Sequence, residues 1–223
     1  MESTTKIAGI AGVIWAATNV AVGMSTGQPP ELDASAADIR TYLVDHRSAM
    51  LAAAFAFALT LPALFAFFGE LIGRLRPGPG AGPMMRGVAG PALAVFAVGF
   101  SLAYVITLPF ALDESFAASA SPSLLRYAWM GTFLITMVGN IGFATLLISL
   151  AAGAAVGHRA AVSATVIGVV TIAVSAAGLV STGVTVVAGL AFLLLAIWMF
   201  SVGVGMVRAE RTASAGSMRP VGA

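Results

Sequence analysis

Between Arg159 and Arg208 the chain runs for 48 residues without an Asp, Glu, Lys or Arg side chain. A straight helix of that length would measure about 72 Å, more than twice the roughly 30 Å of a bilayer's hydrocarbon core. The segment must therefore fold back on itself, and Ser181-Thr182-Gly183 is the turn-forming triplet nearest its middle. We predict two membrane-spanning helices joined by a tight hairpin at this triplet.

The rest of the chain also has the composition of a polytopic membrane protein. Only 9% of its 223 residues are charged and 59% are hydrophobic, with a mean hydropathy of +0.99, whereas soluble domains carry about 25% charged residues. A spanning helix needs about 20 predominantly apolar residues. We predict an all-α bundle over residues 1–208 and a disordered cytoplasmic tail over 209–223. The six predicted transmembrane helices cover about 7–25, 48–72, 87–111, 124–152, 161–180 and 184–206.

Basic residues at the ends of the predicted spans indicate how the bundle is oriented. With the N-terminus in the cytoplasm, eight Lys and Arg residues fall on the inner side and three on the outer side, and cytoplasmic loops of membrane proteins are enriched in basic residues. Six spans then place both termini in the cytoplasm. We predict a multi-pass protein of the cell (plasma) membrane. Its first span is longer than the roughly 7–15 apolar residues of a signal-peptide core, so we expect it to be retained.

A short amphipathic helix is predicted in the first outer loop. Ser35 followed by Asp38 has the spacing of a capping box, in which side chains satisfy the free amides of a helix start. Ile39, Tyr42 and Leu43 then share one helical face. We expect this helix to lie at the outer membrane interface. The alternative is that it extends the second span as one long helix.

Small and aromatic residues predict how the spans pack and where they meet the membrane surface. Small residues four apart allow two helix backbones to approach closely, and interfacial Trp and Tyr side chains form aromatic belts. The small-residue sets are Ala8/Gly12/Ala16, Gly99/Ala103 and Ala164/Gly168. The expected belt residues are Phe116, Tyr127 and Trp129 on the outer side and Trp198 on the inner side.

Three carboxylates are the candidate catalytic residues if the chain is an enzyme: Glu70, Asp113 and Glu114. Glu70 lies four residues before Arg74, an order and spacing that favour an ion pair on a helix. We favour this role over a functional acid inside the membrane, which is the alternative. Asp113 and Glu114 are adjacent, so on a helix they point about 100° apart and do not form a ready-made pair. Glu114 shares a face with Thr107 if the third span continues that far.

Five polar or aromatic residues within the spans are the candidate ligand-binding residues: Trp15, Asn19, Tyr104, Thr136 and Asn140. An unpaired amide in hydrocarbon is costly, so each asparagine should have a partner. Trp15 precedes Asn19 by four residues, and Thr136 precedes Asn140 by four. These side chains either hold helices together or line a polar pocket.

Several kinds of chemistry lack the residues they require. The chain has no cysteine, so disulfides, thiolate metal sites and cysteine nucleophiles are excluded. His46 and His158 are predicted on opposite sides of the bilayer and cannot bind one metal or haem together. The single lysine, Lys6, lies outside the spans, which excludes a retinal Schiff base. We expect no metal and no cofactor. The net charge of +2 is too small for a nucleic-acid surface.

The segment ELDASAADIRTYLVDHRSAMLAAAFAFALTLPALFAFFGELIGRLR, residues 31–76, joins an acidic outer helix to an apolar span that ends in Leu and Arg. In this pattern it resembles uncharacterised six-span integral membrane proteins of high-GC Gram-positive bacteria. The resemblance covers about the first third of the chain and implies no functional residues. In size and hydrophobicity, but in no motif, the chain is similar to small bacterial membrane terpene cyclases.

Two functions are consistent with these features. The first is an integral membrane protein that binds a hydrophobic small molecule or a protein partner within or beside the bundle. The alternative is a membrane-embedded, terpene-cyclase-like enzyme that acts on a lipid or isoprenoid by carboxylate general acid catalysis. Such an enzyme needs a carboxyl group kept protonated in an apolar pocket. Two of the candidate carboxylates and asparagines in one closed cavity would favour the enzyme.

Overall fold

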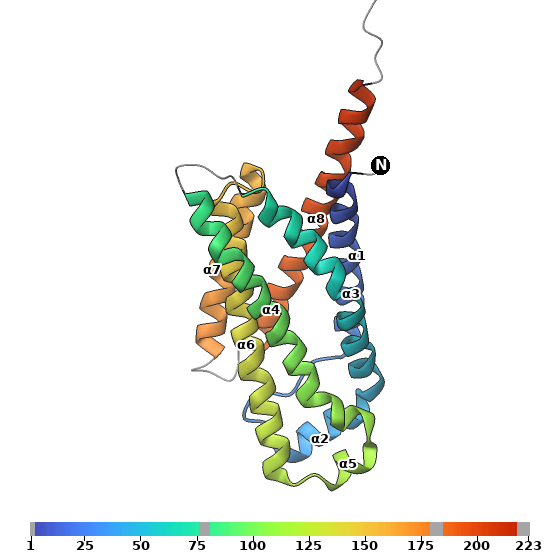
Figure 1. The fold of residues 1–223 in the computed structure, drawn as a ribbon. Coiled ribbons are helices and arrows are strands. Elements are labelled where there is room, and N and C mark those ends of the chain that lie inside the picture. Colours follow the sequence, from blue (N-terminus) through green and yellow to red (C-terminus); the bar gives the residue numbers. More distant parts are fainter. Residues whose placement is uncertain (1–2, 76–80, 179–184, 218–223) are drawn as a thin grey trace, which may run out of the picture.

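The computed structural model describes residues 3–75, 81–178 and 185–217, with side chains at 3–75, 82–178 and 192–210. Helices make up nearly all of these ranges, and none of them contains a β-strand (Figure 1). In chain order the helices are α1 (Thr4–Ser25), α2 (Ala36–Asp45), α3 (Arg47–Gly73), α4 (Ala81–Leu112), α5 (Glu114–Ser119), α6 (Pro122–Ala152), α7 (His158–Gly178) and α8 (Thr185–Ser217).

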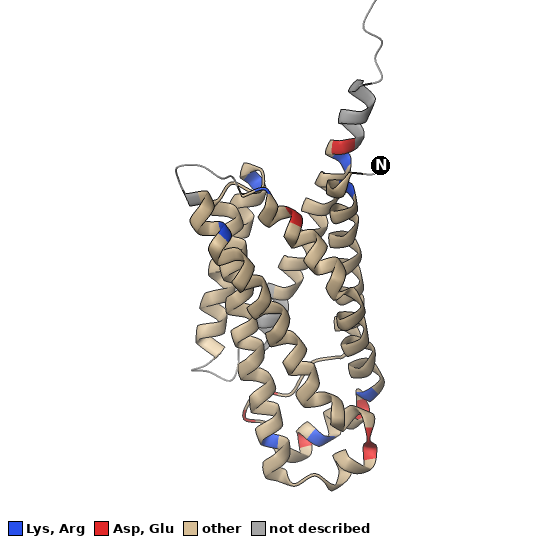
Figure 2. Ribbon diagram, viewed as in Figure 1, with Lys and Arg blue, Asp and Glu red and all other residues tan. Residues whose placement is uncertain are grey.

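Six of these helices are long and apolar enough to cross a membrane, namely α1, α3, α4, α6, α7 and α8. Charged side chains gather at the two ends of the bundle and leave the middle apolar (Figure 2). The chain is therefore an all-α polytopic membrane protein, as predicted. We call the end that contains Glu70 and Arg74 the Glu70 end, and the end that contains α2 and α5 the α5 end. The first residue of α1 and the last of α8 both lie at the Glu70 end (Figure 1).

Close approaches at glycine hold the long helices together. A Cβ atom added to Gly99 of α4 would lie 2.7 Å from the Cα atom of Gly139 in α6. A Cβ atom on Gly9 of α1 would lie 2.7 Å from the carbonyl oxygen of Gly203 in α8. In a membrane, where apolar burial gives little net drive, such contacts let van der Waals packing hold helices together. The predicted close packing at Gly99 is confirmed.

Apolar side chains cover the outward faces of the helices as well as the core. Trp15, Phe67 and Phe96 are fully buried between helices. Leu59 of α3 and Val105 of α4 are instead 78% and 60% exposed in the isolated chain. A soluble protein rarely exposes a large contiguous apolar surface, whereas these faces suit contact with lipid tails. This explains why the sequence shows no clear apolar stripe along its spans.

The first predicted outer loop does contain a separate helix, but its apolar face packs on protein. His46 ends α2, and α3 begins at Arg47. Ile39 and Leu43 are 1% and 2% exposed, in a cluster with Phe110 and residues of α5 and α6. The predicted helix is therefore present and separate from α3, and its apolar face packs on protein at the α5 end of the bundle. That protein surface is formed by α6, by the end of α4 and by α5, a short helix that we did not predict.

Several other sequence-based predictions need correction or lie outside the described residues. α4 ends at Leu112, so the helix does not continue to place Glu114 on the face of Thr107. Trp198 is 4% exposed and buried rather than placed in an interfacial belt. α8 continues to Ser217, so helix covers part of the segment 209–223 for which we expected disorder. The predicted hairpin at 181–183 and residues 218–223 lie outside the described part of the chain.

Candidate functional site

Two adjoining cavities lie between the middle of the bundle and the α5 end. The first has a volume of about 190 Å³ and is lined by residues of α1, α3, α4 and α8. The second, of about 210 Å³, is lined by residues of α1, α2, α3, α4 and α6. They share the four residues Gly23, Ala53, Phe100 and Tyr104. Because Tyr104 borders both, we treat them as one candidate site and call it the aromatic site.

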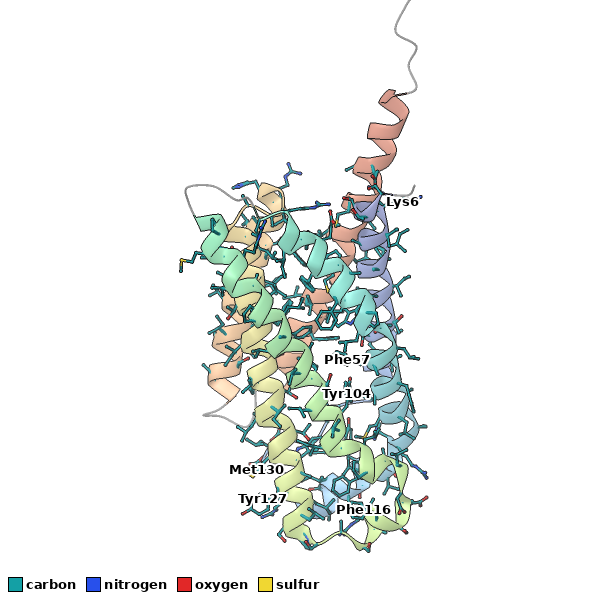
Figure 3. All side chains as sticks on the ribbon, in the orientation of Figure 1. Lys6, Phe57, Tyr104, Phe116, Tyr127 and Met130 are labelled. Atoms are coloured by element: carbon teal, nitrogen blue, oxygen red, sulfur yellow. The ribbon has the colours of Figure 1, made fainter. Side chains whose placement is uncertain are left out.

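Six aromatic residues line the aromatic site: Tyr42, Phe57, Phe100, Tyr104, Trp129 and Phe192. The ring of Phe57 in α3 lies 5.5 Å from that of Tyr104 and 6.0 Å from that of Phe100, both in α4. On the second cavity, Trp129 of α6 lies edge-on to Tyr42 of α2 at 5.6 Å. Rings in such contact form a rigid apolar surface with few rotatable bonds. Figure 3 shows Phe57 and Tyr104 on neighbouring helices within the bundle.

Asn19 of α1 supplies a polar group to the first cavity. Its Nδ2 donates to the Trp15 carbonyl at 2.9 Å and to the Thr60 hydroxyl of α3 at 3.0 Å. Thr60 in turn donates its only hydroxyl proton to the Ala56 carbonyl at 2.6 Å. Thr60 must therefore accept from Asn19, which fixes which end of the amide is nitrogen. Within the described part of the chain no group donates a hydrogen bond to the Asn19 carbonyl oxygen, and Asn19 lines the cavity.

Hydroxyl groups line the second cavity. Thr107 donates to the Ala103 carbonyl at 3.2 Å, and Thr136 donates to the Thr132 carbonyl at 2.8 Å. These bonds use the hydroxyl protons, so the threonine oxygens can accept further bonds but have no proton left to donate. The Tyr104 hydroxyl makes no hydrogen bond to any described residue. The aromatic site therefore offers several acceptors and one free phenol.

Tyr42 closes the second cavity on the side of α2. Burial raises the pKa of the Tyr42 hydroxyl above its ordinary value, and a hydrogen bond with the Thr26 side chain acts in the opposite direction. A phenol whose pKa is raised from about 10 stays protonated at neutral pH. Tyr42 is therefore a neutral hydrogen-bonding group in this wall.

A third cavity lies on the other side of Phe57 and Tyr104, between α3 and α4. Its volume is about 270 Å³, and these two residues also line it. The remaining lining residues are almost all apolar and include Phe55 and Val105, which are 61% and 60% exposed on the outward face. Phe57 and Tyr104 thus separate this cavity, which lies at the outward-facing surface of α3 and α4, from the aromatic site in the interior of the bundle.

Glu70 lies in an ion pair rather than in a cavity. Its Oε1 accepts from Arg74 Nε at 3.2 Å and from Arg74 Nη2 at 3.1 Å. It also accepts from the Thr5 hydroxyl of α1 at 2.8 Å. The predicted pair with Arg74 is present, and Thr5 extends it to a second helix. Glu70 lines neither cavity of the aromatic site.

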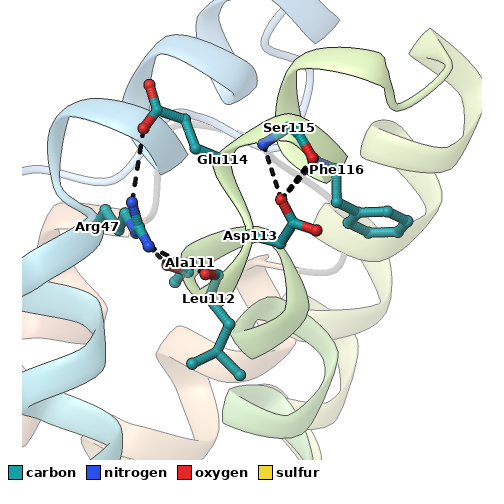
Figure 4. A network of polar contacts seen from close by, with 7 residues as sticks. All are labelled: Arg47, Ala111, Leu112, Asp113, Glu114, Ser115 and Phe116. Atoms are coloured by element: carbon teal, nitrogen blue, oxygen red, sulfur yellow. Dashed lines mark hydrogen bonds and ion pairs between the residues drawn. The ribbon is translucent and has the colours of Figure 1, made fainter.

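Asp113 and Glu114 stabilise the α5 end (Figure 4). Asp113 is the N-cap of α5 and accepts from the backbone amides of Ser115 and Phe116 at 2.9 and 3.1 Å. The hydrogen bond from the Ser115 hydroxyl is the largest cause that lowers the pKa of Asp113, and the amide of Phe116 follows. Glu114 lies 3.5 Å from the guanidinium of Arg47, which also donates to the carbonyl of Leu112 at 3.0 Å.

Three of the five candidate binding residues therefore come together in the aromatic site: Asn19, Tyr104 and Thr136. Trp15 is fully buried against Phe96 and lines neither cavity. Asn140 also lines neither cavity, although it lies one turn beyond Thr136. No sequence pattern indicates the aromatic walls, because the phenylalanines of a cavity wall and those of a lipid-facing surface occur in equally apolar segments.

No three His, Asp or Glu side chains come together as possible metal ligands within the described ranges. Comparison with protein-family models, with curated proteins and with solved structures finds no match for this chain.

Proposed function

We propose that this membrane protein binds a hydrophobic small molecule that carries a hydroxyl or similar hydrogen-bond donor, and that it does so in the aromatic site. The observation that supports the proposal most is the pair of cavities that meet at Tyr104. Ligand sites typically combine apolar and aromatic walls with a few polar groups that fix orientation. Here the Asn19 carbonyl oxygen and the Tyr104 hydroxyl are those groups.

The polar groups favour a ligand that donates a hydrogen bond. The Asn19 oxygen and the threonine oxygens can accept hydrogen bonds but have no proton to donate. A ligand hydroxyl would satisfy such an acceptor, whereas a pure hydrocarbon would not. An apolar body of the ligand would lie against the rings of Phe57 and Phe100.

The third cavity supports the proposal that a ligand reaches the aromatic site from the membrane rather than from water. Its apolar lining opens between α3 and α4, on faces exposed in the isolated chain. A hydrophobic molecule is far more concentrated in lipid than in water, because burial of apolar surface is favourable. In this proposal the ligand passes from the bilayer between Phe57 and Tyr104 into the aromatic site.

The alternative of carboxylate acid catalysis receives no support from the described geometry. An enzyme of that kind needs a carboxyl group in the pocket that holds the substrate. Glu70, Asp113 and Glu114 are instead bound to Arg74, to the start of α5 and to Arg47. We therefore propose binding rather than catalysis as the role of the chain.

We further propose that the protein resides in the cell membrane with both termini in the cytoplasm, and that it is related to six-span proteins of high-GC Gram-positive bacteria. Support for the orientation comes from the ends of the bundle, because basic residues mark the cytoplasmic side. At the Glu70 end they are Lys6, Arg74, Arg86, Arg159 and Arg208, against Arg40, Arg47 and Arg126 at the α5 end. Alkaline phosphatase fused after Ala223 should be inactive, and activity there would refute this orientation.

Ligand binding can be tested with farnesol and its hydrocarbon analogue farnesene, added to the purified protein in detergent. We expect farnesol to raise the unfolding temperature, because a ligand at a hundredfold excess over its Kd stabilises by about 2.7 kcal/mol. Farnesene should give a smaller shift, since it cannot satisfy the Asn19 oxygen. Equal shifts, or none with either compound, would contradict the proposal.

A pair of tyrosine variants locates the binding. Tyr104→Phe removes the hydroxyl in the aromatic site and should weaken farnesol binding roughly two- to tenfold, the effect of one neutral hydrogen bond. Tyr127→Phe is the matched control, because Tyr127 is 76% exposed near the α5 end and lines neither cavity. An equal loss in both variants would show that farnesol does not bind at Tyr104.

A further inference from the structure

A separate crevice lies between α7 and α8 at the Glu70 end of the bundle. Its volume is about 470 Å³, and none of its lining residues belongs to the aromatic site. α7 packs mainly on α6, and α8 packs mainly on α1, but the two helices also contact each other. The indole nitrogen of Trp198 bridges them by donating to the Ala160 carbonyl at 2.9 Å. We call this space the α7–α8 crevice.

Two arginines from different helices line the α7–α8 crevice, Arg74 and Arg159. Arg74 is 35% exposed, and its charge is balanced by Glu70 at 3.1 Å. Arg159 is exposed, and within the described part of the chain its guanidinium makes no hydrogen bond or ion pair. The crevice therefore carries about one uncompensated positive charge, which matches a ligand group with a single negative charge.

The floor of the crevice and the surface next to it are apolar. Trp198, Val202 and Met206 line it from α8. One turn or more further towards the middle of the bundle, Val162 and Val166 follow Arg159 along the same face of α7. These valines are 51% and 56% exposed. A molecule with its anionic group at Arg159 could therefore lay an apolar chain along α7 in the membrane.

We propose that the α7–α8 crevice binds the phosphate group of an anionic membrane phospholipid, with the acyl chains along the outward face of α7. Basic pockets between transmembrane helices bind acidic lipid headgroups in this way. The single net charge suits a phosphodiester, and the exposed valines favour a lipid over a soluble phosphate. The proposal is independent of ligand binding in the aromatic site, because the two sites share no lining residue.

The test is native mass spectrometry of the full-length protein, released from detergent in the presence of dioleoyl-phosphatidylglycerol or dioleoyl-phosphatidylcholine. The two lipids have the same acyl chains and differ in headgroup charge. We expect the wild-type protein to retain phosphatidylglycerol in preference. Arg159→Gln should reduce this preference about fivefold, as expected for one arginine near an anionic lipid. Arg159→Lys, which keeps the charge, should retain most of it.

Arg126→Gln is the matched control, since Arg126 is also exposed but lies at the α5 end. It should leave the lipid preference unchanged, and an equal loss in this variant would overturn the proposal. Retention of both lipids alike by the wild-type protein would also overturn it. Competition distinguishes the source of the phosphate without any variant. Displacement by inorganic phosphate as effective as that by lyso-phosphatidylglycerol would assign the crevice to a soluble anion and refute lipid binding.

Discussion

The contact between Gly99 of α4 and Gly139 of α6 gives the sharpest prediction about what holds the bundle together. In Gly99→Ala the new methyl group would lie 2.7 Å from the Cα atom and 2.9 Å from the amide nitrogen of Gly139. Real Cβ atoms are not found so close to backbone, and a backbone cannot rotate away as a side chain can. The two helices must therefore separate, and overpacking of this kind costs about 1–3 kcal/mol.

Gly87→Ala is the matched control on the same helix, because a Cβ atom there meets nothing within 4 Å. Both changes replace glycine by alanine within α4, so any gain in helix propensity is the same and cancels in the comparison. The difference between the two variants then measures the cost of separating α4 from α6. Reversible unfolding in mixed micelles of dodecylmaltoside and sodium dodecyl sulfate gives both free energies. Equal stability of Gly99→Ala and Gly87→Ala would refute the close contact.

Three further predictions concern single polar residues. Glu70→Gln should lower the free energy of unfolding by less than about 1 kcal/mol, since partly exposed ion pairs contribute little, and a larger loss in the same micelle assay would contradict this. Asn19→Leu removes the hydrogen bond from α1 to Thr60 of α3 and should lower the free energy of unfolding by about 0.6–2 kcal/mol. The control Thr145→Val removes only a hydroxyl that is hydrogen-bonded within α6, and it should lower the free energy of unfolding by less. The pKa of Asp113 is lower in the folded protein than its ordinary value near 3.9. The cap therefore stabilises α5 fully at pH values above this ordinary value, and the stabilisation is lost as the pH falls through the lowered pKa of the folded protein. The protection factor of the Phe116 amide, its intrinsic exchange rate at each pH divided by the observed rate, should therefore fall on acidification in the wild-type protein but not in Asp113→Asn. A protection factor that is independent of pH in both proteins would show that the cap contributes nothing.

The spans could be predicted from sequence because length and hydropathy alone decide whether a helix fits a bilayer. The separate helix α2 could also be predicted, since Ser35 accepts from the Asp38 amide at 3.2 Å as the capping pattern implied. The pair of Glu70 and Arg74 followed from a spacing of four residues on one helix. Each of these features depends on residues close together in the chain.

The aromatic site could not be predicted in the same way, because it depends on residues far apart in the sequence. Asn19 and Thr60 are 41 residues apart, and nothing in either segment indicates that α1 and α3 meet there. Phe57 and Phe100 lie in spans that are apolar on every face, so periodicity does not separate cavity walls from lipid-facing surface. α5 was missed because its six residues are too few for a periodic pattern, although Asp113 before Ser115 was a usable sign of a helix start.

Occupancy of the aromatic site can be measured directly, because the natural chain has no cysteine and a single introduced thiol is unique. Thr136→Cys places the thiol in the second cavity, and Ser123→Cys places one on the exposed start of α6, outside both cavities. The account predicts that N-ethylmaleimide labels both variants in membranes, and that farnesol slows labelling at position 136 but not at position 123. Labelling at position 136 that farnesol leaves unchanged, or that does not occur, would contradict the proposal that this site holds a hydrophobic ligand.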